Sequence, residues 1–113
     1  RSPLAAQKCV TDVKMRGDIL AILCEEDHKI SIMLVDPSGN LRFIHRPIFD
    51  GELAQDVSIT YEELIVVRHS SSAYQIYLQI NSDVDGRTIE MFEVFVEDAS
   101  LKVFQETIVL PAD

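Results

Sequence analysis

The feature that most constrains this chain is an internal repeat of short apolar segments. The dipeptide Asp12-Val13 recurs 56 − 12 = 44 residues later as Asp56-Val57, and the apolar positions that follow the first copy fall on apolar positions after the second. Sequence repeats of roughly 20–50 residues each correspond to one supersecondary unit. The chain is therefore expected to contain two copies of one such unit.

The spacing of apolar residues predicts that both copies consist of β-strands. Ile30, Ile32 and Leu34 alternate with their neighbours, and segment 74–80 alternates in the same way. Such alternation is typical of a strand with one buried face. The continuous apolar run ILAILC at 19–24 indicates a strand that is covered on both faces. With no amphipathic helical pattern in evidence, the predicted fold class is all-β.

A second internal match places the second copy differently. Segment 29–42 resembles segment 88–102 with one extra residue, and the strand that follows aligns as well. We follow this match, so residues 70–87 become an insertion that extends the second strand and adds a hairpin. The predicted organisation is 1–9 as a leader, tag or linker, 10–50 as the first β repeat and 51–113 as the second. The predicted strands are 10–14, 19–24, 29–35 and 41–46, then 57–60, 64–69, 88–96 and 101–110.

Turn residues separate these segments. Asp36-Pro37-Ser38-Gly39 fits a type I turn, with Asp first, Pro second and Gly fourth. Asp85-Gly86 predicts a hairpin turn between two apolar strands. Arg16-Gly17-Asp18 and Tyr61-Glu62-Glu63 are expected to separate shorter strands in comparable places.

Four strands in about 40–45 residues are typical of a β-propeller blade. The first repeat reads Thr11-Asp12-Val13-Lys14, then Gly17-Asp18-Ile19-Leu20-Ala21-Ile22, then Val35-Asp36-Pro37-Ser38-Gly39. This sequence resembles degenerate WD40-like β-propeller repeats, of the type that follows an F-box in some adaptor proteins. The Gly-His and Trp-Asp dipeptides of true WD40 repeats are absent. The resemblance implies about two four-stranded antiparallel blades and substrate recognition in a ubiquitin-ligase adaptor.

Two blades do not close a propeller, because roughly four to eight are typical. Each blade also buries its faces against its neighbours. We therefore expect that the chain belongs to a larger propeller or assembles as a homo-oligomer. Because it begins at Arg1 and not at Met, we favour a piece of a longer protein. The alternative fold is a β-sandwich or small barrel, which these short strands and frequent turns would also supply.

The net charge and the cysteines limit the classes of binding partner and the cellular location that we expect for this chain. The net charge of −9 disfavours nucleic acid, and no apolar run is long enough for a membrane span. Cys9 and Cys24 lie 15 residues apart, without CxxC spacing or paired histidines. We interpret them as buried free thiols in a reducing compartment, which predicts an intracellular location, cytoplasmic or nuclear.

Acidic residues in the expected turns are the candidate partner-binding residues. In a propeller, the loops at one rim form the binding surface, so acidic turns there would select a basic peptide. The hairpin at 81–86 has the acidic spacing that opens a calcium loop, but Phe92 occupies the twelfth position, where a carboxylate is needed. No metal site and no cofactor are therefore predicted. The predicted partner-binding residues are Glu25, Glu26, Asp27, Asp83, Asp85 and Arg87.

Catalytic residues are not recognisable in this sequence. His69 precedes three serines, but neighbouring strand residues point to opposite faces, and no Gly-x-Ser-x-Gly motif is present. The leading hypothesis is a non-enzymatic protein–protein interaction module, part of an intracellular β-propeller scaffold or adaptor. The alternative is a self-assembling, ring-forming sugar-binding protein, although the absence of Trp does not fit the stacking of sugars on indole rings.

Overall fold

The structure is a computed structural model and describes residues 9–51, 53, 56–98 and 100–111. These residues form eight β-strands and no helix, which confirms the predicted all-β fold class. Consistently, this part of the chain contains no helix that could cross a membrane. The strands are β1 (Asp12–Arg16), β2 (Ile19–Cys24), β3 (Lys29–Val35), β4 (Leu41–Pro47), β5 (Ile59–Arg68), β6 (Ala73–Ser82), β7 (Gly86–Val96) and β8 (Leu101–Val109).

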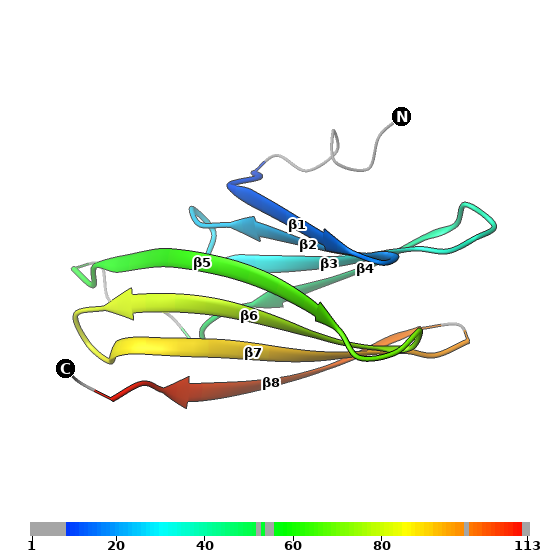
Figure 1. Cartoon of the computed structure of the whole chain (residues 1–113). Helices are drawn as coiled ribbons and strands as arrows, with labels where there is room; N and C mark the ends of the chain where they lie inside the picture. The colour runs from blue at the N-terminus through cyan, green and yellow to red at the C-terminus, as the bar shows by residue number, and fades with distance from the viewer. Residues whose placement is uncertain (1–8, 52, 54–55, 99, 112–113) are drawn as a thin grey trace.

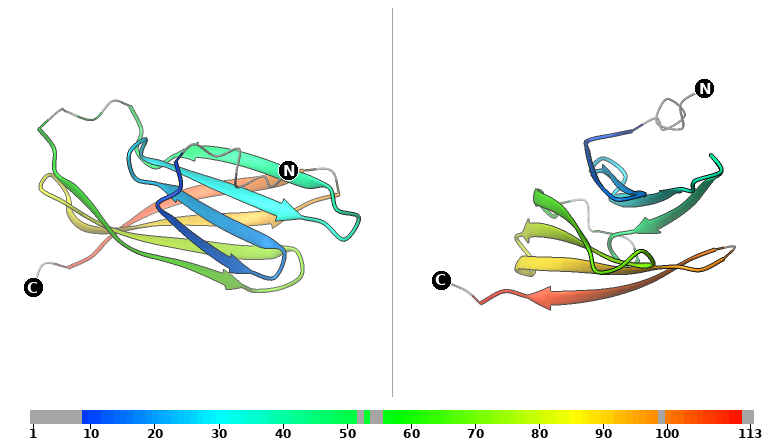
Figure 2. Two further views of the ribbon diagram at one scale, coloured as in Figure 1. Left: turned by 90° about the horizontal axis from the view of Figure 1, so that it is seen from above. Right: turned by 45° about the vertical axis from the view of Figure 1, so that its right-hand side comes forward.

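The strands form two four-stranded antiparallel sheets in the order in which they occur along the chain. The first sheet is β1-β2-β3-β4 and the second is β5-β6-β7-β8. Within each sheet, every strand thus pairs with its neighbours in sequence, and the two sheets lie as two layers (Figures 1 and 2). Edge strands β1 and β5 contact each other, whereas β4 and β8 make few contacts. The layers are therefore closer together along the β1–β5 edge than along the β4–β8 edge.

The hydrophobic core lies between the two sheets. Strand residues alternate between faces, and those that point toward the opposite sheet form one continuous buried cluster. This face of a sheet is called its inner face below, and the other is its outer face. The largest fully buried side chains are Tyr74 and Phe92, both from the second sheet. The remaining buried members are Ile19, Ala21, Leu23, Ile30, Ile32, Leu34, Ile48, Leu64, Val66, Ile76, Leu78, Ile80, Val94 and Leu101.

The β1–β2 turn packs closely on the second sheet. Gly17 has φ +57, and a Cβ added there would lie 2.7 Å from the Tyr74 hydroxyl oxygen. The Arg68 guanidinium stands 5.7 Å from the centroid of the Tyr74 ring, within the range of a cation–π contact. Both the backbone conformation and the available space therefore require glycine at this turn.

The sequence prediction is wrong about how the second sheet begins. Tyr61-Glu62-Glu63 is no turn, because β5 runs without a break and only its register against β6 shifts between Tyr61 and Glu63. A β-bulge of this kind absorbs one extra residue while the strand continues. Residues 73–82, expected in an insertion, are the regular strand β6 between β5 and β7.

The sheet order also decides between the two internal matches. β3 and β7 are the third strands of their sheets and β4 and β8 the fourth, as the match of 29–42 with 88–102 predicted. The spacing of 44 residues is not reproduced. β1 and β5 begin 59 − 12 = 47 residues apart, and β4 and β8 begin 101 − 41 = 60 residues apart. The longer strands of the second sheet cause this drift.

The other predicted turns are confirmed. Arg16-Gly17-Asp18 connects β1 to β2, and Asp85-Gly86 stands where the β6–β7 turn ends and β7 begins. In the β3–β4 turn, the Gly39 amide donates to the Asp36 carbonyl over 3.0 Å. The Asp36 carboxylate accepts further hydrogen bonds, from the Ser38 hydroxyl at 2.6 Å and from the Ser38 and Asn40 amides at 3.0 Å.

These bonds predict an acid-sensitive turn. The Ser38 hydroxyl, with the amides of Asn40 and Ser38 and the charge of Arg42, lowers the pKa of Asp36 below its ordinary 3.8. A lowered folded pKa means that the stabilisation is complete above 3.8 and is lost as the pH falls through the folded value. We expect an NMR titration of the Asp36 carboxyl carbon to have its midpoint below 3.8, and Ser38→Ala to move that midpoint upward. A midpoint that Ser38→Ala leaves unchanged would contradict this assignment.

The two cysteines form a disulfide, so the prediction of free thiols is wrong. Cys9 and Cys24 have their Cα atoms 5.4 Å apart, within the range that a disulfide requires. Antiparallel pairing of β1 with β2 brings them together, because the Thr11 amide donates to the Leu23 carbonyl and so continues the hairpin toward Cys9. Sequence spacing alone did not reveal this proximity. The argument for an intracellular location that rested on free thiols no longer applies.

Candidate functional site

The predicted partner-binding residues gather at one end of the molecule. Both the β2–β3 turn, with Glu25 to Asp27, and the β6–β7 turn, with Asp83 and Asp85, lie at the left-hand end in Figure 1. Glu26 and Asp27 are exposed, as are Asp83 and Asp85. This end of the two sheets is therefore acidic, and we call it the acidic end.

A contact between the sheets fixes the β2–β3 turn at the acidic end. His28, which has φ 52, is hydrogen-bonded through Nδ1 to the Tyr61 hydroxyl over 2.6 Å. The His28 ring also contacts Phe49 edge-on, with centroids 6.0 Å apart. Burial, with a smaller effect of the Glu25 carboxylate, raises the pKa of Tyr61 far above its ordinary value. The hydroxyl thus stays protonated, and the turn remains attached to β5.

The acidic residues of the β6–β7 turn have different surroundings. The Asp83 carboxylate accepts a hydrogen bond from the Ser58 amide over 2.8 Å, so it holds the start of β5. Asp85 instead lines a cavity between the β4–β5 connection and the second sheet. Arg87 stands at an outer-face position of β7, opposite Asn81. Among the described residues that line this cavity, Asp85 is the one predicted partner-binding residue.

This cavity lies where the β4–β5 connection passes over the inner face of the second sheet. Its volume is about 610 Å³. A smaller apolar cavity of about 250 Å³ shares Phe49, Leu53, Ser82 and Asp85 with it. The residues that line the larger cavity are Ile48, Phe49, Asp50, Leu53, Ser82, Asp85, Thr88, Glu90, Gln105, Thr107 and Val109.

Glu90 places a buried carboxylate in the wall of this cavity. Its side chain is on the inner face of β7 and only 4% exposed. One carboxylate oxygen accepts from the Thr107 hydroxyl over 2.6 Å and the other from the Gln105 amide over 2.8 Å. The same Gln105 amide donates to the Ile48 carbonyl, which joins β8 to the end of the first sheet. These three β7 and β8 residues form the Glu90 cluster.

Sequence reasoning did not find the Glu90 cluster. One signal was available, because Thr88 and Glu90 occupy the positions that alternate into the core, followed by Phe92 and Val94. A carboxylate at a core-facing position is unusual and needs partners. Locating those partners requires the β7–β8 register, in which Glu90 is opposite Thr107.

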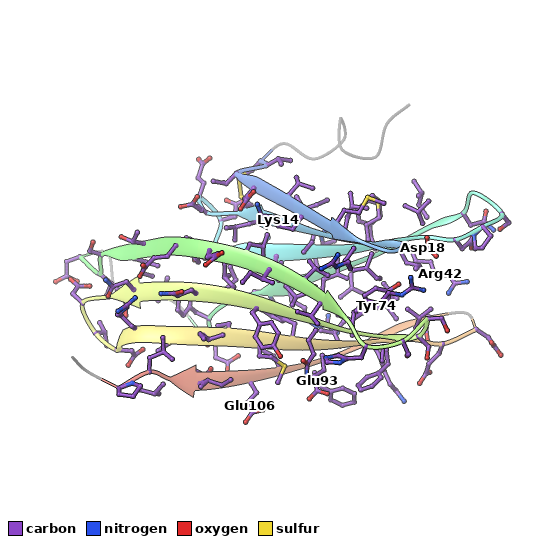
Figure 3. The ribbon with its side chains drawn as sticks, viewed as in Figure 1. Lys14, Asp18, Arg42, Tyr74, Glu93 and Glu106 are labelled. Carbon is purple, nitrogen blue, oxygen red and sulfur yellow. A yellow bond between two sulfur atoms is a disulfide. The ribbon has the colours of Figure 1, made fainter. Side chains whose placement is uncertain are left out.

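The outer face of the second sheet has a different character, because it exposes large apolar side chains. Ile65, Phe95, Phe104 and Ile108 are 43%, 36%, 56% and 38% exposed, and the Phe95 and Phe104 rings meet edge-on. Figure 3 shows Tyr74 between the sheets, whereas Glu106 projects away from the first sheet. On the outer face of the first sheet, Met15 and Leu41 on the edge strands are 63% and 40% exposed, whereas the central Leu20, Ile22 and Met33 are buried.

A metal centre is not found in the part of the chain that the structure describes. Within these residues, no group of three or more His, Cys, Asp or Glu side chains could hold a metal ion. Comparison of the chain with protein-family models, with curated proteins and with solved structures gives no match. The geometry of these two surfaces therefore carries the functional argument.

Proposed function

We propose that this chain is a non-catalytic interaction module that associates with a second copy of itself through the outer face of its second sheet. The observation that carries the proposal is the exposed apolar group Ile65, Phe95, Phe104 and Ile108 on that face. Monomeric soluble proteins rarely expose apolar patches larger than a few hundred Å², and larger ones mark interaction sites.

The internal repeat supports a sheet as the partner surface. In the match between β3 and β7, Ile30 and Ile32 correspond to Ile89 and Met91. The first pair lies on the inner face of the first sheet and packs on another sheet. The second pair lies on the outer face of the second sheet, since Tyr77 stands opposite both Ile65 and Met91. At these two positions the outer face of the second sheet thus carries apolar side chains, as the packed inner face of the first sheet does.

A second copy is the occupant that these residues favour. An isologous contact brings the same face of both chains together, which covers the exposed apolar group in both copies at once. On the outer face of the first sheet, the exposed Met15 and Leu41 lie apart on the two edge strands, β1 and β4, so this face is less suitable. The two-layer arrangement of consecutive four-stranded sheets, closest along β1 and β5, also agrees with a pair of propeller-type blades.

The test is the oligomeric state of the chain, measured by sedimentation velocity over a concentration series. We expect a dimer whose dissociation constant rises at least about 100-fold in Phe104→Glu, since a charge would be buried at a hot-spot position. Val84→Glu is the matched control, because Val84 is exposed to 69% but lies in the β6–β7 turn, away from this face.

Two results would contradict the proposal. A wild-type chain that stays monomeric throughout the series would show that a second copy does not cover this face. The face would then be expected to pack against a sheet of another protein. Equal dissociation constants for Phe104→Glu and wild type would show that the copies meet elsewhere.

A further inference from the structure

We propose that the cavity lined by Glu90 binds an organic cation, an alkylammonium or guanidinium head on an apolar stem. The site lies between the β4–β5 connection and the inner face of the second sheet and uses no residue of the exposed apolar group, so it does not depend on the proposed self-association. Its ligand would enter at the acidic end, where Asp85 lines the cavity.

The charged residues among the described lining of the cavity are all acidic. Asp50, Asp85 and Glu90 line the cavity, while no Lys, Arg or His is found among its described lining residues. An ionised carboxylate that is 4% exposed needs compensation for the loss of water. Among the described residues, the donors that Glu90 has for this purpose are both neutral, the Thr107 hydroxyl and the Gln105 amide.

The geometry of Glu90 leaves capacity for a ligand. An ionised carboxylate offers about four lone-pair sites, and the two hydrogen bonds occupy two of them. Gln105 and Thr107 also fix the orientation of the carboxylate, because one holds each oxygen. A cationic N–H donor that reaches Glu90 would thus meet a pre-positioned acceptor, and bonds of this charge-assisted type are the stronger ones.

The rest of the wall determines the shape of the ligand. The apolar part of the wall consists of the side chains of Ile48, Phe49, Leu53 and Val109, and the polar part includes Glu90. An apolar stem with a charged end fits such a two-sided wall, as the side chains of Lys and Arg do. A volume of about 610 Å³ accommodates either such a side chain or a free small amine.

The test is an NMR titration of the ¹⁵N-labelled chain with n-butylguanidinium, and in parallel with its neutral isostere n-butylurea. We expect shift changes at the amides of Glu90 and Thr107 with the guanidinium compound alone. Glu90→Gln should weaken this binding at least about tenfold, because the charged acceptor is lost. Glu93→Gln is the matched control, since Glu93 lies on β7 but faces outward, opposite Phe104, and its affinity should stay within about twofold of wild type.

Three outcomes would overturn the proposal. They are equal shifts with butylurea, no shifts at either amide, and unchanged affinity in Glu90→Gln. If Glu90→Gln fails to fold, Asp85→Asn removes a second charge of the cavity wall from an exposed position and should also weaken binding of the guanidinium compound; unchanged affinity in that variant would overturn the proposal.

The source of the cation is resolved by a second probe, N-acetyl-arginine N-methylamide. Affinity comparable to that of butylguanidinium would show that the cavity accepts an arginine side chain within a polypeptide. Binding of butylguanidinium alone would show that it accepts a free small cation. Either result supports the charge-based site.

Discussion

Replacing Phe92 by alanine is expected to lower the free energy of unfolding by about 3–5 kcal/mol. The Phe92 ring comes from β7, is 0% exposed and belongs to the core between the sheets. Its removal takes away apolar burial and leaves a cavity that the surrounding strands fill only in part. Because domains of this size are stable by about 5–15 kcal/mol, the loss is a large share of the total.

The measurement is equilibrium unfolding in urea, with Phe104→Ala as the matched control. Phe104 is also a phenylalanine of the second sheet, but it is 56% exposed on the outer face. At protein concentrations low enough to keep the chain monomeric, we expect Phe104→Ala to cost at most about 1 kcal/mol, mainly its ring contact with Phe95. Similar losses in both variants would mean that the second sheet does not pack through the face described above.

Removing the disulfide is the second large effect. The double variant Cys9→Ala/Cys24→Ala should be less stable than wild type by about 3 kcal/mol, the value for closing a loop of about 15 residues. Adding dithiothreitol to the wild-type chain should lower its unfolding midpoint toward that of the variant. The variant itself should not respond to dithiothreitol. A wild-type midpoint that is insensitive to the reductant would instead favour the free thiols that the sequence predicted.

Local patterns predicted the first sheet more accurately than the second. The ranges 19–24 and 29–35 agree with β2 and β3 because turn residues separate short apolar runs there. In the second sheet, the polar pair Glu62-Glu63 has the composition of a turn, yet the strand continues through it as a bulge. Pairing with β6 decides this outcome, and pairing between distant residues is not visible in local composition.

For the candidate functional surfaces too, features that depend on local composition were predictable, whereas features that depend on strand pairing were not. Acidic turns were recognisable from composition, and the structure places Asp83 and Asp85 in one such turn. The Glu90 cluster was not recognisable, because it depends on the β7–β8 register and on Ile48, which is 105 − 48 = 57 residues from Gln105. The disulfide was not predicted for a similar reason, since the pairing of β1 with β2 determines how close Cys9 and Cys24 come.

The strand order also has a consequence for synthesis on the ribosome. Because each strand pairs with its sequence neighbour, the first sheet can form as soon as residue 47 has emerged, and such local pairing favours fast folding. Its inner face then stays uncovered until β6 and β7 are synthesised, because these strands supply most of the opposing buried side chains. While the second half is translated, the nascent chain therefore exposes an apolar layer. During this interval a chaperone would protect the chain from aggregation.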